Sequence, residues 1–319
     1  MALQPDPPGS AAALDLLAEA TATPANSPRL RQAVVAALEL LKPITWFPPM
    51  WAFSCGVVSS GKGLLDNWSM ALLGILLAGP MVCATSQAIN DWFDRHVDAI
   101  NEPSRPIPSG RLPGTWGFRL ALLWTMLSVA VASLLGPWGF GAGLAGLVLA
   151  WAYSMPPIRL KQNGWLGIAA CGLAYEGLAW LTGYAVMTDG QAPTGPVIWL
   201  ALLYSTGAAG IMALNDFKAI AGDQAHGIRS LPVLYGPRIA ARLAIAIMLL
   251  PQVLVMLLLM SWGHPWAATS LLILLIAQAA LMIWFERAPV ERALMLSGFG
   301  VPLFVSGMMI SAWQIGTGS

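Results

Sequence analysis

Residues 238–260 have the sequence RIAARLAIAIMLLPQVLVMLLLM and contain only two charged side chains, both arginines in the first five positions. A helix needs about 20 apolar residues to cross the hydrocarbon core of a bilayer, and this stretch supplies them. The rest of the chain is similar, because 57% of its 319 residues are apolar and only 10% are charged. Soluble domains carry roughly 25% charged residues. We therefore expect an all-α integral membrane protein.

Eight further stretches have a comparable length and apolar character. Nine spans of this kind predict about nine transmembrane helices around a central cavity, with boundaries uncertain by several residues. The predicted spans are 44–61, 68–89, 117–136, 138–157, 165–187, 196–215, 238–260, 266–285 and 293–313.

The basic residues predict how the chain crosses the membrane. Arg29, Arg31 and Lys42 precede the first span, whereas only Lys62 follows it closely. Since cytoplasmic flanks carry the excess of lysine and arginine, we expect a cytoplasmic N-terminus. Alternation of nine spans then leaves Lys62 as the only lysine or arginine outside the cytoplasmic side.

The sequence divides into two parts. Residues 1–38 contain Pro, Ala and Asp but no lysine or arginine before Arg29, so they lack the basic region of a signal peptide. We expect a flexible cytoplasmic tail over residues 1–38 and a polytopic membrane domain over residues 39–319. The formal net charge of +1 gives no indication of nucleic-acid binding, and we expect none.

The first acidic stretch, NDWFDRHVDAI, follows the second predicted span. Asp91, Asp94 and Asp98 are spaced three and four residues apart, so on a helical end they would project from one face and repel one another. A bound Mg²⁺ would remove this repulsion. Because Mg²⁺ usually combines one or two carboxylates with phosphate oxygens, the cluster predicts a diphosphate substrate, with Asn90 beside it. The alternative is a solvated helix end that only caps and turns the chain.

A proline-rich loop follows this stretch at residues 101–116. Its four prolines predict a stiff, non-helical segment that holds Arg105 and Arg111 in place. An arginine whose fork is already oriented loses less entropy when it binds a phosphate. We therefore predict that both arginines bind substrate.

A second acidic stretch begins 125 residues after the first. It contains Asn215, Asp216, Lys218 and Asp223 and again follows an apolar span directly. Four spans lie between the two stretches, so both fall on the same, cytoplasmic side. This weak repeat predicts a ligand cavity at the centre of the two halves, although the short match is also compatible with coincidence.

Two further polar features lie between the acidic stretches. The turn YSMPPIRLKQNG begins at Tyr153 and carries Arg159 and Lys161, which either neutralise a departing diphosphate or serve only as topology determinants. Glu176 lies near the middle of the fifth span, where a carboxylate is costly. It therefore lines the substrate chamber or makes a structural hydrogen bond between helices.

Several of these motifs match a known family. KPITWFPPMWAF (42–53), NDWFDRHVDAINEPSRPIPSGR (90–111), YSMPPIRLKQNGW (153–165) and NDFKAIAGDQAHGIRSLPV (215–233) resemble the UbiA-type intramembrane prenyltransferases, and in particular their (bacterio)chlorophyll branch. The resemblance covers nearly everything after residue 38. It implies nine transmembrane helices around a laterally opening cavity and two Mg²⁺-dependent aspartate motifs.

The resemblance also implies a reaction and its partners. The propionate of bacteriochlorophyllide a would be esterified with geranylgeranyl or phytyl diphosphate, and diphosphate would be released. The expected location is the inner or intracytoplasmic photosynthetic membrane, with other pigment-biosynthesis proteins as candidate partners. The implied Mg²⁺ ligands are Asp91, Asp94, Asp98, Asp216 and Asp223, with Arg105, Lys161 and Arg229 as phosphate partners.

Other functions remain open from the residues alone. A chlorophyll synthase, or a prenyltransferase acting on a quinone precursor or on haem, would use the same motifs with a different acceptor pocket. A transporter would place its ion sites near the bilayer midplane, whereas these carboxylates gather on one face. A pigment carrier would not need the diphosphate motif. One departure from the family is Ala221, where relatives usually carry glutamate.

Overall fold

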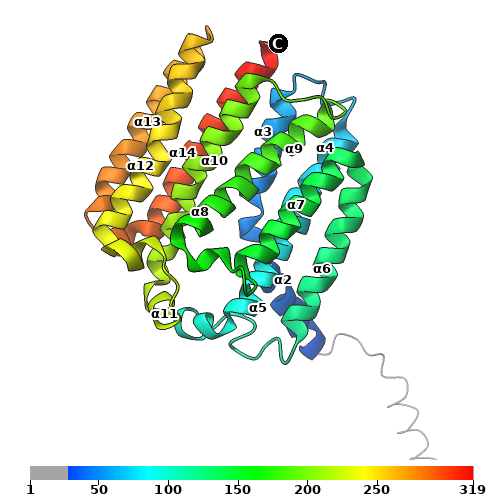
Figure 1. The fold of residues 1–319 in the computed structure, drawn as a ribbon, viewed down its shortest axis with the longest axis vertical. Coiled ribbons are helices and arrows are strands. Elements are labelled where there is room, and N and C mark those ends of the chain that lie inside the picture. The colour runs from blue at the N-terminus through cyan, green and yellow to red at the C-terminus, as the bar shows by residue number, and fades with distance from the viewer. Residues whose placement is uncertain (1–27, 319) are drawn as a thin grey trace, which may run out of the picture.

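The computed structural model describes residues 28–318 and contains helices and turns, with no strand of a sheet in that range. Long helices lie side by side in a bundle, and the loop after α5 lies beside α11 at its lower end (Figure 1). The α-helices are α2 (Pro28–Leu41), α3 (Phe47–Ser59), α4 (Trp68–Leu76), α5 (Ala84–Asn101), α6 (Trp116–Ala132), α7 (Gly136–Ser154), α8 (Gly164–Gly172), α9 (Ala179–Met187), α10 (Gly195–Asn215), α11 (Ile220–Ala225), α12 (Leu231–Ser261), α13 (Pro265–Glu286) and α14 (Pro289–Thr317).

Two of the long helices are interrupted by π-helical turns. The turn η2 (Leu77–Cys83) joins α4 to α5, and η5 (Leu173–Leu178) joins α8 to α9. Pro80 lies within η2 and has no backbone N–H to donate. A π-helical turn accommodates an extra residue, shifts the side chains that follow and is frequent at functional sites.

The number of membrane crossings differs from the prediction. Six helices in the described range are long and apolar enough to cross a membrane, so the count of nine is not confirmed. One of these six is the continuous helical run Trp116–Ser154. It covers most of two predicted spans, 117–136 and 138–157, because the short helix η3 (Ser133–Leu135) joins α6 to α7 without a break.

The predicted N-terminal tail also needs a correction. Residues 28–38, assigned to a flexible segment, form most of helix α2. Ala36, Leu40 and Leu41 of this helix are buried in a cluster that includes Ala88 and Ile89 of α5. An apolar face with helical spacing stabilises α2 by packing, which the composition of the tail did not reveal. Residues 1–27 lie outside the described range.

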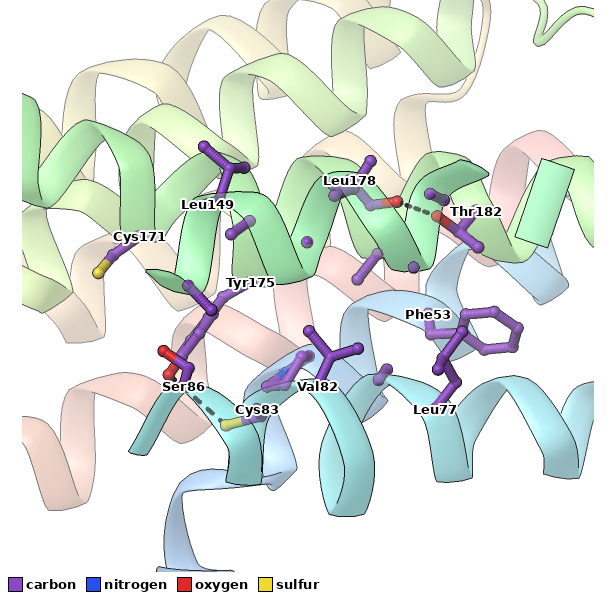
Figure 2. A pocket seen from close by; sticks show the side chains of 18 of the residues that line it. Phe53, Leu77, Val82, Cys83, Ser86, Leu149, Cys171, Tyr175, Leu178 and Thr182 are labelled. Carbon is purple, nitrogen blue, oxygen red and sulfur yellow. Dashed lines mark hydrogen bonds between the residues drawn. The ribbon is translucent and has the colours of Figure 1, made fainter. Parts of the chain in front are cut away.

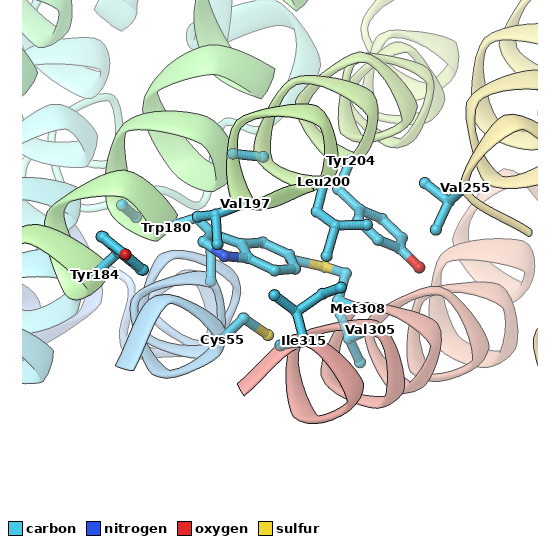
Figure 3. Packing of buried hydrophobic residues seen from close by; sticks show 14 of the residues in the cluster. Cys55, Trp180, Tyr184, Val197, Leu200, Tyr204, Val255, Val305, Met308 and Ile315 are labelled. Atoms are coloured by element: carbon cyan, nitrogen blue, oxygen red, sulfur yellow. The ribbon is translucent and has the colours of Figure 1, made fainter. Parts of the chain in front are cut away.

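The largest cluster of buried side chains lies between α3, α9, α10 and α14 (Figure 3). The rings of Trp180 and Tyr204 are stacked with centroids 5.8 Å apart. Trp180 Nε1 donates a hydrogen bond to Ser59 Oγ at 3.1 Å, and Tyr204 Oη lies 3.0 Å from Ser311 Oγ. Apolar helices gain little from contact with one another in lipid, so close packing and such hydrogen bonds hold them together.

Two glycines allow α3 and α9 to approach closely. A Cβ atom on Gly56 would overlap the carbonyl oxygen of Trp180, and one on Gly183 would overlap that of Phe53. Small residues at such crossings bring helix backbones together and increase van der Waals contact. The position of α9, and of η5 before it, therefore depends on these two glycines.

Replacing Gly183 with leucine should separate α3 from α9 and lower the free energy of unfolding by about 1–3 kcal/mol, since overpacking forces the backbone to move. The midpoint of thermal unfolding in detergent measures this loss. Gly141→Leu provides the matched control, because Gly141 is exposed on α7 with open space around it. Equal midpoints for the two variants would contradict the close approach.

Candidate functional site

A polar pocket lies where the C-terminal ends of α5 and α10 meet α11. Its empty volume is about 720 Å³, part of which is open to solvent. Both acidic stretches contribute to its wall, as the repeat in the sequence predicts. The polar lining residues are Asn90, Asp94, Asp98, Asn101, Arg105, Tyr153, Lys161, Asn215, Asp216, Lys218, Asp223 and Ser230.

The first acidic stretch is helical rather than a loop, because α5 continues to Asn101. Ser86, Asn90, Asp94 and Asp98 follow one another at intervals of four residues. Residues at this spacing lie on one face of an α-helix, so the carboxylates are presented in a row. The sequence predicted that Asp91, Asp94 and Asp98 project from one face; Asp94 and Asp98 line the same pocket wall, whereas Asp91 does not.

Asp91 has a different environment from the other two aspartates. It is buried and does not belong to the lining of the polar pocket. Its Oδ1 atom accepts hydrogen bonds from Lys42 Nζ at 2.6 Å and from Arg105 Nη1 at 3.2 Å. Its Oδ2 atom is buried without a hydrogen-bond partner. Lys42 thus takes part in the site, although the sequence suggested only a role in topology.

Asp94 lies at the centre of a second group of charges. Lys161 Nζ and Arg159 Nη2 both pair with its carboxylate, the latter at 3.2 Å, and Asn90 Nδ2 donates to it at 2.9 Å. Burial lowers the pKa of Lys161, and the neighbouring Asp94 carboxylate opposes that shift. Arg105 Nη1 donates to Asp98 at 2.7 Å. Cations from the loops therefore offset the repulsion between the aspartates.

Asn101 fastens the second acidic stretch to the first. Its Oδ1 atom accepts a hydrogen bond from the backbone N–H of Gly222 at 2.9 Å, and its Nδ2 atom donates to the carbonyl of Ala219 at 3.3 Å. Asp223, next to Gly222, is buried, and burial raises its pKa. Asn101 was not among the predicted site residues, although its position three residues after Asp98 indicates the same helix face.

Glu102 links the same two segments by charge. Its carboxylate accepts from Arg105 Nε at 2.8 Å and pairs with Lys218 Nζ at 2.9 Å. Although burial acts in the opposite direction, these two cations lower the pKa of Glu102 to about 2. Glu102, which follows Asp98 by one helical turn, was likewise not among the predicted site residues. Lys218 is therefore held toward the pocket from the side of the first motif.

Besides Arg159, which pairs with Asp94 from outside the pocket wall, three of the predicted substrate-binding residues do not line either pocket. Arg111 forms an ion pair with Glu39 at 2.6 Å and is about two-fifths exposed. Arg229 is exposed, and Glu176 is buried within η5. None of the three belongs to the lining of either pocket described here. Their predicted contact with substrate therefore gains no support from the geometry.

An apolar pocket adjoins the polar one, and Tyr153 lines both. It lies between η2, α5, α7 and η5 and has an empty volume of about 700 Å³, part of which is open to solvent. Figure 2 shows Ser86, Cys83 and Tyr175 toward one end of this pocket and Phe53, Leu77 and Thr182 toward the other. The two pockets together can hold a molecule with a charged head and a long apolar tail.

Comparison with known proteins identifies the family of this fold. Residues 46–307 match the profile described as the UbiA prenyltransferase family. The chain belongs to this family. Members of the UbiA family are prenyltransferases, so the chain is an enzyme of that class and a multi-pass membrane protein.

Two relatives and one solved structure define the similarity further. A protein named bacteriochlorophyll synthase 33 kDa chain from Cereibacter sphaeroides is 55% identical over 280 residues, which cover 88% of this chain and 92% of the relative. A protein of the same name from Rhodobacter capsulatus is 54% identical over 282 residues, covering 88% and 93%. The structure of a UbiA homolog from Archaeoglobus fulgidus bound to DMAPP and Mg²⁺ has a TM-score of 0.61 and 19% identity, covering 85% and 98%.

The residues of the polar pocket fit a magnesium ion. They supply carboxylate and amide oxygens, which are the ligands that Mg²⁺ prefers. Among the described residues, no three acidic, histidine or cysteine side chains form a group that could hold a metal by themselves. Mg²⁺ usually takes one or two carboxylates together with phosphate oxygens. The UbiA pocket thus suits an ion that arrives with a diphosphate.

Replacing Gly222 with alanine should displace the second acidic stretch, because the added Cβ would overlap the Asn101 side-chain amide. We expect prenyl transfer by the purified protein to fall at least tenfold, with little change in the unfolding midpoint. Ala221→Ser is the matched control, since Ala221 is the exposed neighbour on the same short helix. Full activity of Gly222→Ala would show that the Asn101 contacts do not position the site.

Proposed function

We propose that this enzyme is a bacteriochlorophyll synthase, which joins the propionate of bacteriochlorophyllide a to C1 of geranylgeranyl or phytyl diphosphate and releases diphosphate. The main support is the 55% identity to a bacteriochlorophyll synthase chain across 88% of the sequence. The adjoining polar and apolar pockets agree with it, because they match the two ends of a prenyl diphosphate.

The polar pocket would bind the diphosphate. Arg105, Lys161 and Lys218 line it and can donate hydrogen bonds to phosphate oxygens. Positive groups aimed at the bridging and terminal oxygens stabilise the negative charge that develops as the C1–O bond breaks. Bound Mg²⁺ would neutralise further charge on these oxygens and improve the leaving group. We propose that one or two of the four aspartates in the pocket wall hold it together with the diphosphate oxygens, with Asn90 and Asn215 nearby; these aspartates are Asp94, Asp98, Asp216 and Asp223.

Asp91 would act through its neighbours. It pairs with both Lys42 and Arg105 and lies outside the pocket wall, so it orients Arg105 toward the diphosphate. Arg159 has a similar position behind Asp94. We therefore propose that Asp91 and Arg159 position the groups that touch the substrate.

The apolar pocket would hold the prenyl tail and protect the reaction from water. Loss of diphosphate leaves an allylic cation, which water would convert to the free prenyl alcohol. An apolar wall around C1 suppresses this side reaction. The attacking propionate needs no general base, because a carboxylic acid with a pKa of about 4.3 is already ionised at neutral pH.

The membrane location is part of the same proposal. The basic residues around the first span support a cytoplasmic N-terminus and a polar pocket on the cytoplasmic side of the inner or photosynthetic membrane. Both acidic stretches follow apolar helices and share one pocket, which agrees with a single face of the membrane. A soluble diphosphate could then leave directly into the cytoplasm.

Incubation of the purified protein with bacteriochlorophyllide a and geranylgeranyl diphosphate tests the proposal. We expect esterified pigment by chromatography with Mg²⁺ and none with EDTA. Parallel reactions with chlorophyllide, a quinone precursor and haem define the acceptor. Ester formed only with one of these other acceptors would assign the protein to a different prenyltransferase activity.

Asp94→Asn supplies the matching test of the site. We expect this variant to stay folded but to lose at least 99% of ester formation, because it removes a charge shared by Lys161, Arg159 and the proposed metal. Glu39→Gln is the control, as Glu39 pairs with Arg111 outside the pocket. Undiminished turnover by Asp94→Asn would remove the basis for the metal role.

The length of the apolar pocket yields a further prediction. Ala78 lines it sixteen residues before Asp94, roughly 24 Å along the helix axis. Ala78→Phe should therefore reduce transfer of the 20-carbon geranylgeranyl group more than that of the 15-carbon farnesyl group. The ratio of the two kcat/KM values measures this effect. Leu76→Phe, at an exposed position on the neighbouring turn, should leave the ratio unchanged.

A further inference from the structure

Tyr175 is a polar residue in the wall of the apolar pocket with no role in the function described so far. It lies in the π-helical turn η5 and faces Cys83, the last residue of the π-helical turn η2 (Figure 2). Its oxygen accepts a hydrogen bond from Gln87 Nε2 at 3.0 Å and another from the Cys83 thiol at 3.5 Å. Two side chains one turn apart on the continuous helix formed by η2 and α5 therefore hold the Tyr175 hydroxyl in place.

No strong acceptor takes the hydrogen bond that the Tyr175 hydroxyl can donate. A phenol has one proton to donate and two positions that accept. Gln87 and Cys83 occupy the accepting positions. If the thiol donates instead to the carbonyl of Thr45, which lies 3.3 Å away, the tyrosine is left with the sulfur, a weak acceptor. In either arrangement, an oxygen atom in the pocket would be a better partner.

The charges of the residues that line the two pockets indicate which substrate oxygen atom Tyr175 binds. None of the described residues that line the apolar pocket is charged, whereas Arg105, Lys161 and Lys218 line the polar pocket. A diphosphate carries several charges and belongs with these cations. A single carboxylate attached to a large apolar acceptor can be held by a neutral donor, and hydrogen bonds to ionised acceptors are about twice as strong as neutral ones.

The distance along α5 between the Tyr175 region and Asp94 agrees with separate sites for the carboxylate and the diphosphate. Ser86 lies beside Tyr175 in the pocket and precedes Asp94 by eight residues, roughly 12 Å along the helix axis. That interval leaves room for a diphosphate bound near Asp94 and for C1 of the prenyl group between the two. A carboxylate held at Tyr175 would face C1 from the side away from the leaving group.

We propose that the Tyr175 hydroxyl binds the carboxylate of the acceptor and orients it for attack on C1. One carboxylate oxygen accepts a hydrogen bond from the tyrosine hydroxyl, which keeps its proton, and the other oxygen forms the new bond to C1 as the bond from C1 to diphosphate breaks. Gln87 and Cys83 hold the tyrosine in position. A neutral donor keeps the carboxylate nucleophilic, whereas an arginine or lysine would pair with its charge. This inference rests on the proposed function.

The test compares Tyr175→Phe with the wild type by spectroscopic titration with bacteriochlorophyllide a and with the methyl ester of its propionate. The variant lacks only the hydroxyl. We expect its Kd for the free acid to rise about tenfold or more, and its Kd for the ester to stay the same. We also expect an unchanged KM for geranylgeranyl diphosphate and a larger share of free prenyl alcohol among the products.

Tyr204→Phe is the matched control, since it removes a buried, hydrogen-bonded hydroxyl outside both pockets. Gln87→Met, which removes the donor that holds Tyr175, should weaken binding of the acid less than Tyr175→Phe does. Equal losses for acid and ester, or a raised KM for the diphosphate alone, would overturn the inference. Absence of ester with the wild-type protein would instead overturn the proposed function.

Discussion

Three carboxylates lie buried on eight residues of helix α5, and the arrangement of the segments around this end of the helix follows from the need to balance their charge. Burying an unpaired charge is costly, so each aspartate requires a cation or a hydrogen-bond donor. Lys42 reaches Asp91 from the end of α2, Arg105 reaches Asp91 and Asp98 from the proline-rich loop, and Lys161 and Arg159 reach Asp94 from the turn after α7. Three separate segments are thereby fixed around one helix.

On one face of helix α5, charged residues lie toward one end and the apolar pocket lies toward the other end. The same face of α5 that carries Asp94 and Asp98 continues through Asn90 to Ser86, and the apolar pocket begins there. The π-helical turns η2 and η5 face each other across that pocket, with Cys83 and Tyr175 in contact. The polar and apolar pockets therefore follow one another along α5, as an amphiphilic molecule requires. None of the described residues that line the apolar pocket is charged.

Much of the site could be predicted because its chemistry is local in the sequence. Asp94 and Asp98 were recognisable from their helical spacing, and Arg105 from the stiff loop that follows. Asn101 and Glu102 escaped notice because their partners, Gly222 and Lys218, are more than 100 residues away. Arg111 resembles Arg105 in its sequence context, yet it pairs with Glu39 instead, and only the path of the loop separates the two.

Apolar length and local spacing are properties of short segments, so the amino-acid sequence alone was enough to predict an all-helical membrane protein of the UbiA family with two acidic motifs. The packing of the helices decided which carboxylates face the pocket, which cations pair with them, and that Glu176 lies outside both pockets. It also decided that residues 28–38 belong to a packed helix. These outcomes depend on contacts between segments far apart in the chain, whose energies arise only when the helices are packed together.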